Sequence, residues 1–180
     1  MDGTEDLWVF AYGSLIWNPG IDVAETRRAR LSGFRRGFCM WSIHHRGSEA
    51  DPGLVLALEP HRGAMCEGLA IRAAAPRVAL EELRARELIS SAYEEAQVDL
   101  ICEQGTRIPA LAYVINTAHR QYAPDLSLDD QARIIAHAHG GRGPNHEYLT
   151  ATAKSLHDLD IGDANIDALV TRVQQIKADH

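Results

Sequence analysis

Residues 8–17 read WVFAYGSLIW, and this stretch decides the fold prediction for the chain. An apolar run ends in Tyr12-Gly13-Ser14, which predicts a β-strand that enters a tight turn. Gly13 permits a backbone course that a Cβ atom restricts. Consecutive N–H groups in such a turn can face one concavity and bind an anion or a developing oxyanion. A strand with a purely structural turn is the alternative interpretation.

Strand-like runs dominate the earlier part of the chain. They are short, rich in Val, Ile, Leu and aromatic residues, and bounded by Gly or Pro. Gly63 and Gly105 lie where hairpin turns are expected. The expected strands are residues 7–11, 35–43, 53–59, 64–72, 97–103 and 108–115.

Helical patterns dominate the later part. Pro76 suits an early helical position, and Ser127 suits an N-cap with two aspartates in the first turn. Because strands come early and helices late, without strict βαβ alternation, we predict an α+β fold, a small mixed β-barrel with helices packed outside. The expected helices run from Pro76 to about Ser90, from Ser127 to Gly140, from about Asn145 to Leu159, and over about 163–177.

Composition excludes several classes of function. The 180 residues suffice for a sizeable core, and we expect one domain over 1–180 with its core at about 7–175. A net charge of −7 argues against a nucleic-acid partner. No apolar run reaches the ~20 residues that span a bilayer. The acidic start, Met-Asp-Gly-Thr-Glu-Asp, argues against a secretory signal, so a cytoplasmic protein without a membrane partner is expected.

The cysteines and histidines do not form a recognisable reactive or metal-binding pattern. Cys39, Cys66 and Cys102 lie in strand-like runs without a C-x-x-C spacing, as expected for reduced, buried thiols. None begins a helix or has a flanking cation cluster, which argues against thiol-based hydrolysis. The nine histidines show no H-x-x-x-H or H-x-x-E-H spacing, so we expect no metal.

One carboxylate lies in the apolar stripe of the first expected helix. Leu80, Leu83 and Glu87 are spaced i, i+3 and i+7 and share one face. Burial disfavours the charged form of a carboxyl group, and this makes a glutamate usable as a base near neutral pH. A simple ion pair with Arg84, three residues earlier, is the alternative.

In this order, several motifs resemble those of the ChaC-type γ-glutamylcyclotransferases over about residues 7–175. The resemblance implies a compact barrel-like α+β fold and makes Glu87, in the Arg-Glu element, the general acid/base. It also implies that the loop Tyr12, Gly13, Ser14 and Leu15 binds the substrate and the oxyanion, and that no cofactor is needed. The motifs are YGSLIW (12–17), HHRG (44–47), DPG (51–53), CEGLA (66–70), ARE (85–87) with Tyr93, and GPNHEYL (143–149).

The implied reaction is intramolecular. Glu87 takes a proton from the α-amine of a γ-glutamyl group, the amine attacks its own γ-carbonyl, and 5-oxoproline forms. The leading substrate is glutathione, which would release Cys-Gly. Another γ-glutamyl amino acid, or a γ-glutamylamine, is an alternative substrate. A non-catalytic regulatory or binding module of the same fold is a further alternative, although such a module has no reason to keep a carboxylate on an apolar face.

Three more side chains are candidate substrate contacts. Tyr93 follows Glu87 by six residues and could hold the substrate or orient the base, or be a plain core tyrosine. Arg46 could meet a substrate carboxylate, or be a surface-loop arginine. Tyr148 is expected to line the pocket, or to belong to a helix-cap cluster with Asn145 as N-cap.

The chain departs from the family pattern after Tyr93. Glu94 and Glu95 stand where a proline or basic residues are expected, and negative charge facing the pocket would disfavour an anionic tripeptide. Tyr113, on an expected strand, is interpreted as structural.

Overall fold

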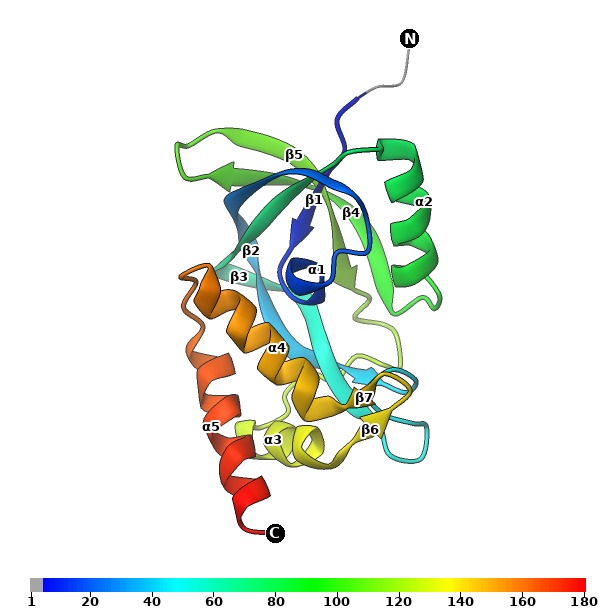
Figure 1. The fold of residues 1–180 in the computed structure, drawn as a ribbon, viewed down its shortest axis with the longest axis vertical. Coiled ribbons are helices and arrows are strands. Elements are labelled where there is room, and N and C mark those ends of the chain that lie inside the picture. Colours follow the sequence, from blue (N-terminus) through cyan, green and yellow to red (C-terminus); the bar gives the residue numbers. More distant parts are fainter. Residues whose placement is uncertain (1–4) are drawn as a thin grey trace. The chain divides into compact units, whose positions relative to one another are not determined.

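The computed structural model describes residues 5–180, and their contacts divide the chain into two compact units (Figure 1). The first unit comprises the chain up to Arg36 together with Leu58–His119. The second comprises Gly37–Ala57 and Arg120–His180. Strands β2 (Val23–Ser42) and β3 (Gly53–Ala73) are long enough to contribute residues to both units.

The first unit holds a closed barrel in the order β1-β3-β2-β4-β5. β1 (Trp8–Ala11) pairs antiparallel with β3 and parallel with β5 (Arg107–Ile115), so the barrel is mixed. β4 (Tyr93–Cys102) and β5 form an antiparallel hairpin. Gly105 has φ +78° in its turn, a left-handed conformation that favours glycine, and this confirms the predicted turn. The predicted α+β barrel is therefore confirmed.

Helix α2 (Pro76–Glu87) packs outside the barrel beside β4 (Figure 1). Pro76 stands in its first turn, as predicted, where a missing N–H costs no intrahelical bond. Of the predicted stripe, Leu83 is buried, whereas Leu80 and Glu87 are half-buried; Ala79, which was not part of the prediction, is buried beside Leu83. The helix ends at Glu87, before the expected end at about Ser90.

The turn after β1 is a short helical turn, α1 (Ser14–Trp17), which the sequence did not predict. Gly13 is its N-cap residue and is buried, with φ −149°. This φ is not left-handed, so the expected glycine-specific backbone conformation is absent there. If glycine is required at position 13, the reason is the limited space around its buried Cα atom and not its φ angle.

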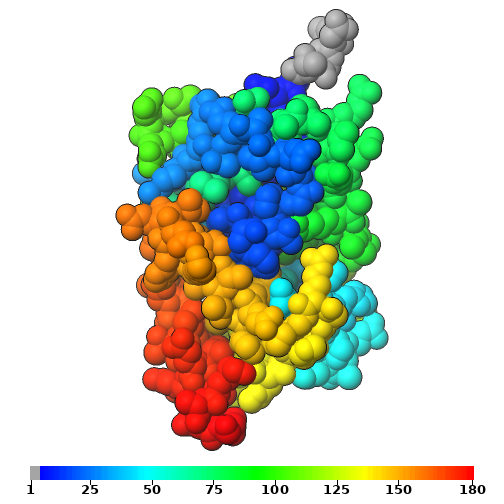
Figure 2. Space-filling view, viewed as in Figure 1, coloured from blue at the N-terminus to red at the C-terminus, as the bar shows by residue number. Residues whose placement is uncertain are grey.

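The second unit contains three helices that pack on one another around Ile135, Leu149 and Leu169. Ser127 is the N-cap of the first of them and accepts from the backbone N–H of Asp130, which confirms the predicted cap. The last two helices lie side by side at the surface (orange and red in Figure 2). The elements of this unit are α3 (Leu128–His137), β6 (His139–Gly140), β7 (Gly143–Pro144), α4 (Asn145–Asp158) and α5 (Ala164–Ala178).

Four of the predicted strands are wrong in extent, and the one expected at 97–103 begins at Tyr93. Residues 53–59 and 64–72 are not separate strands but parts of β3, and Gly63 takes φ +84° within it. Strand β2 begins at Val23 and not near residue 35. Its first half is rich in arginine, which hid an alternation in which Ala29 and Leu31 are buried and Arg30 is exposed.

Candidate active site

The substrate loop predicted at Tyr12–Leu15 is held from two sides in the first unit. The Tyr12 hydroxyl donates to the backbone carbonyl of Tyr113 at 2.8 Å. The Tyr12 carbonyl accepts from Arg36 Nη1 at 2.6 Å, and Arg36 Nη2 also donates to the carbonyl of Glu67. Because the Tyr12 side chain is buried and engaged in this way, it anchors the loop, and the backbone is the part that can serve a substrate.

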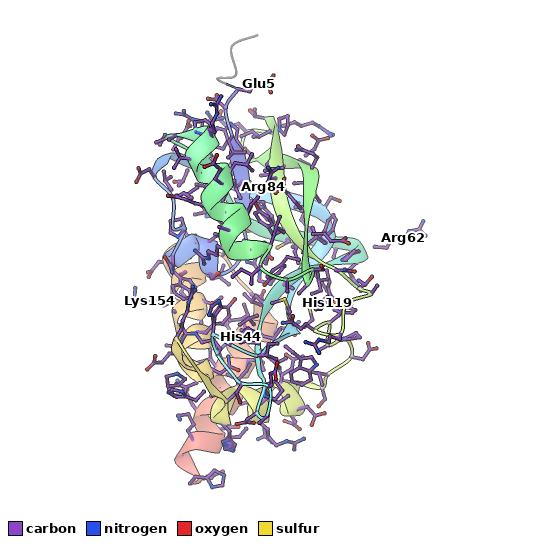
Figure 3. All side chains as sticks on the ribbon, turned by 90° about the vertical axis from the view of Figure 1, so that its right-hand side faces the viewer. Glu5, His44, Arg62, Arg84, His119 and Lys154 are labelled. Carbon is purple, nitrogen blue, oxygen red and sulfur yellow. The ribbon has the colours of Figure 1, made fainter. Side chains whose placement is uncertain are left out.

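Glu87 is the last residue of α2, and only 13% of its side chain is exposed. Arg86 Nε lies 3.4 Å from its Oε1. Arg84, the partner expected in the alternative interpretation, instead binds both carboxylate oxygens of Glu95, at 3.0 and 2.8 Å. Figure 3 labels Arg84 on α2. The carboxylate thus has its cationic neighbour in Arg86.

Arg86 also reaches the substrate loop. Its Nη2 donates to Ser14 Oγ at 3.2 Å, and its Nη1 donates to the Asn18 carbonyl at 2.6 Å. The candidate base and the loop that follows β1 are therefore joined through one guanidinium. Sequence analysis missed Arg86 as a site residue, although its position next to Glu87 in the Arg-Glu element was a usable signal.

Tyr113 contacts the carboxylate of Glu95. Its hydroxyl donates to Glu95 Oε2 at 3.4 Å. Burial, followed by the charges of Glu95 and then Glu87, raises the pKa of Tyr113, so its hydroxyl keeps its proton. The hydrogen bonds from Arg84 lower the pKa of Glu95. This arrangement had no sequence signal, because Tyr113 lies in an apolar strand.

Tyr93 begins β4 and is half-buried. Glu95, two residues later, stands directly opposite Tyr113 on β5. Residues two apart on a strand point to the same face, so Tyr93 shares the face of the hairpin that carries Glu95 and Tyr113. The first unit thus gathers Glu87, Tyr93 and the Tyr12–Leu15 loop.

Arg46 and Tyr148 belong to the second unit, where they contact each other. The Arg46 guanidinium lies 5.9 Å from the centre of the Tyr148 ring, and its Nη1 donates to the Pro144 carbonyl at 3.1 Å. The Arg46 side chain is 11% exposed, so the surface-loop alternative is wrong. Burial lowers the pKa of Arg46 from its ordinary value, and Glu147 at 4.0 Å opposes that effect.

The alternative interpretation, in which Asn145 is the N-cap of a helix-cap cluster, is wrong. Pro144 is the N-cap residue of α4, and Asn145 is fully buried. The Asn145 amide accepts from the Leu54 N–H and donates to the Leu54 carbonyl, both at 2.8 Å. The Tyr148 hydroxyl accepts from the Leu56 N–H at 3.2 Å. Asn145 and Tyr148 therefore make hydrogen bonds to backbone groups of β3 that a neighbouring strand would otherwise make.

Among residues 5–180, no group of three or more His, Cys, Asp and Glu side chains is arranged to hold a metal ion. Cys39, Cys66 and Cys102 are buried thiols that are not joined in disulfides, and burial raises the pKa of Cys102. Within the same described range, no helix is long and apolar enough to cross a membrane.

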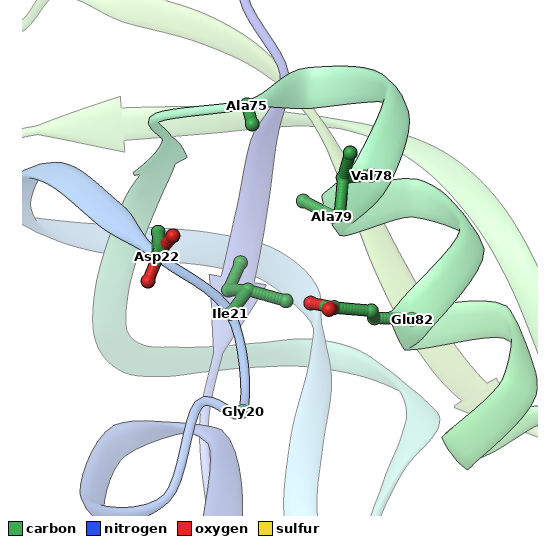
Figure 4. A pocket seen from close by; sticks show the side chains of 7 residues that line it. All are labelled: Gly20, Ile21, Asp22, Ala75, Val78, Ala79 and Glu82. Carbon is green, nitrogen blue, oxygen red and sulfur yellow. The ribbon is translucent and has the colours of Figure 1, made fainter.

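The first unit also has a hollow of about 210 Å³ at the start of α2 (Figure 4). Ile21, Val78 and Ala79 line it together with the carboxylates of Asp22 and Glu82. No residue of the predicted site lines it. This hollow therefore does not mark the predicted site.

The closed mixed barrel is the fold of the γ-glutamylcyclotransferases. A crystal structure of a γ-glutamylcyclotransferase specific to glutathione, from yeast, matches with a TM-score of 0.87 over 98% of this chain and 99% of that one, at 23% identity. The family model described as ChaC-like protein matches residues 7–176, so the chain belongs to the ChaC-like family.

Two curated relatives extend the comparison. A glutathione-specific γ-glutamylcyclotransferase of Escherichia coli is 31% identical over 178 residues, aligned with 97% of this chain and 75% of its own length. A protein of the same description from Schizosaccharomyces pombe is 34% identical over 172 residues, covering 85% of this chain and 84% of its own.

Proposed function

We propose that this protein is a γ-glutamylcyclotransferase that cleaves glutathione to 5-oxoproline and Cys-Gly, with Glu87 as its general acid and base. The observation that carries the proposal is the Glu87 carboxylate, mostly buried at the end of α2 and joined through Arg86 to the substrate loop. The relatives from Escherichia coli and Schizosaccharomyces pombe, which are glutathione-specific γ-glutamylcyclotransferases, support glutathione as the substrate.

The reaction needs one proton carrier. Glu87 accepts a proton from the α-ammonium of the γ-glutamyl group, and the freed amine attacks the γ-carbonyl carbon. The carbonyl oxygen becomes an oxyanion, which the backbone N–H groups of Gly13, Ser14 and Leu15 stabilise. Glu87 returns its proton to the cysteine nitrogen as the bond to it breaks, then accepts the second proton from the ring nitrogen and passes it to the departing amine, so that 5-oxoproline, the Cys-Gly ammonium and the Glu87 carboxylate result. No metal or cofactor takes part.

Most of the acceleration comes from holding the substrate in a folded conformation. Ring closure joins two groups of the same molecule, and correct orientation of such groups contributes roughly 7–11 kcal/mol. Arg46 binds a substrate carboxylate: a guanidinium has five N–H donors, and the contact with Pro144 takes one of them. Tyr93 and Tyr148 complete the proposed contacts, Tyr93 through its hydroxyl and Tyr148 through the ring beneath Arg46.

The charge of Glu95 does not oppose an anionic substrate as strongly as the sequence suggested. Arg84 binds both of its carboxylate oxygens, so the pair is close to neutral. Glu94 is exposed, as alternation along β4 requires. Glutathione, which carries two carboxylates, therefore remains the leading substrate. We further propose a cytoplasmic protein that forms one domain over residues 1–180 and has no nucleic-acid or membrane partner.

A substrate panel tests the proposal. The protein is incubated with glutathione, a γ-glutamyl amino acid and a γ-glutamylamine, and 5-oxoproline is followed by mass spectrometry. We expect the largest kcat/KM for glutathione, with equal amounts of Cys-Gly. A larger kcat/KM for another γ-glutamyl compound would overturn glutathione as the substrate but would leave the proposed cyclisation intact. Binding of glutathione without any 5-oxoproline would refute the enzyme and favour the non-catalytic module.

A further inference from the structure

We propose that Arg86 is a positioning residue that sets the distance between the substrate loop and Glu87; this inference rests on the proposed function. The guanidinium uses all three of its nitrogens. Nη1 donates to the Asn18 carbonyl at 2.6 Å, Nη2 donates to Ser14 Oγ at 3.2 Å, and Nε lies 3.4 Å from Glu87 Oε1. One rigid planar group therefore contacts the proposed base and the loop that would hold the oxyanion.

The contacts span the whole of α1. Ser14 is the first residue of this helical turn, and Asn18 is its C-cap residue. A four-residue turn cannot hold its own shape, because helix nucleation is unfavourable and its last carbonyls lack intrahelical partners. Arg86 bonds both ends, so it fixes the orientation of α1 relative to the end of α2.

The surroundings leave room for this guanidinium. Gly20 has φ +68°, and a Cβ there would lie 3.1 Å from Arg86 Nη1. The Arg86 side chain is 21% exposed, so its hydrogen bonds are partly shielded from water. Charge-assisted hydrogen bonds in such a setting are stronger than neutral ones and hold a defined geometry.

Lysine cannot replace this function fully. Its ammonium is a point charge on a flexible stem, whereas the arginine fork meets three partners in fixed directions. Arg86→Lys keeps the charge beside Glu87 and loses the simultaneous grip on Ser14 and Asn18. Arg86→Gln loses both the charge beside Glu87 and the simultaneous hydrogen bonds to Ser14 and Asn18. Misplacement of a reacting group by about 1 Å can cost ~100-fold in rate.

The test compares kcat and KM for glutathione in the wild type, Arg86→Lys, Arg86→Gln and the control Arg77→Gln. Arg77 is an exposed arginine on the same helix, outside the site. We expect kcat to fall roughly 100-fold in Arg86→Gln and roughly 10-fold in Arg86→Lys, with KM within about 3-fold. Thermal unfolding checks that all variants are folded at the assay temperature.

A double-mutant cycle makes the test specific. If Arg86 acts through the loop, Ser14→Ala lowers kcat in the wild type and has a much smaller effect in Arg86→Gln. Additive effects, or an unchanged kcat in folded Arg86→Gln, would overturn the inference. An inactive wild type together with an inactive Arg77→Gln would instead refute the proposed function, so the two failures are distinguishable.

Discussion

The two units use their buried polar side chains in different ways. In the first, charged and hydroxyl groups contact one another: Arg86 meets Glu87, and Glu95 meets Tyr113. In the second, Asn145 and Tyr148 bond to the backbone of β3. Contacts between ionisable groups change when a proton moves, whereas an amide bonded to backbone does not respond to pH. The contacts among Arg86, Glu87, Glu95 and Tyr113 can thus respond to a proton, whereas those of Asn145 hold the shape of β3.

Glu87→Gln should give the largest effect. Glutamine has nearly the same shape but cannot accept the ammonium proton, so we expect kcat for 5-oxoproline formation to fall roughly 10²–10⁴-fold. The melting temperature should change little. Glu81→Gln, an exposed position on the same helix, is the matched control and should retain wild-type kcat. Activity of Glu87→Gln within a factor of two of wild type would sink the assignment.

Gly13→Ala should give the next largest effect on turnover. Gly13 is buried at the start of α1, and we expect a methyl group there to crowd the loop and shift its N–H groups. Loss of one oxyanion donor typically costs ~2.7–4 kcal/mol in the transition state, which predicts a kcat roughly 10²–10³-fold lower and a smaller change in KM. A rise in KM alone would mean that the loop binds only the ground state. A kinetically silent variant would remove the loop from the site.

Asn145→Ala should affect stability instead of chemistry. The change leaves the N–H and the carbonyl of Leu54 without the amide that satisfies both. Each buried unsatisfied group costs about 1–3 kcal/mol, so we expect the free energy of unfolding to fall by about 2–5 kcal/mol. Urea denaturation measures this. Thr150→Ala, on the exposed side of the same helix, should change it by less than ~0.5 kcal/mol. Equal effects of the two variants would contradict the structural role of Asn145.

The same contrast explains what sequence alone could predict. β1 and the Ser127 cap depend on neighbouring residues, so local pattern located them. Glu87 became the candidate base because a charge interrupts an apolar stripe, and this role stays a prediction. The partners of Arg86 could not be found, since Ser14 lies 72 residues away in the chain. Asn145 was misassigned for the same reason: its partner, Leu54, is 91 residues away.

Strand β2 shows a further limit. Its arginine-rich first half has one face that is exposed, and the charged residues of that face outweigh the buried ones in any average over a short window. Only the period-2 alternation at Ala29 and Leu31 remained as a signal. Composition therefore predicts strands with two buried faces better than it predicts strands with one.

Arg46→Lys should give a smaller effect, on substrate binding. Lysine keeps the charge but cannot bind a carboxylate with two parallel hydrogen bonds, so we expect KM for glutathione to rise roughly 10-fold with kcat nearly unchanged. Arg142→Lys, an exposed position nearby in the chain, is the control. A γ-glutamylamine without the glycine carboxylate sharpens the result. If the KM ratio persists with it, Arg46 binds the α-carboxylate; if the ratio vanishes, Arg46 binds the glycine carboxylate. An unchanged KM for glutathione would exclude Arg46 from binding.

Removal of metal ions should have no effect. The proposed reaction takes its proton carrier from Glu87 and its oxyanion donors from backbone N–H groups, so no step needs a Lewis acid. Prolonged dialysis against EDTA should therefore leave kcat and KM within experimental error. The comparison of the two units depends on this result, since a metal would take over the polarising role assigned to the substrate loop. Loss of turnover in EDTA that zinc or another divalent ion restores would refute the metal-free mechanism. A metal that stabilised the oxyanion in place of the loop N–H groups would also make the expected fall in kcat of Gly13→Ala small.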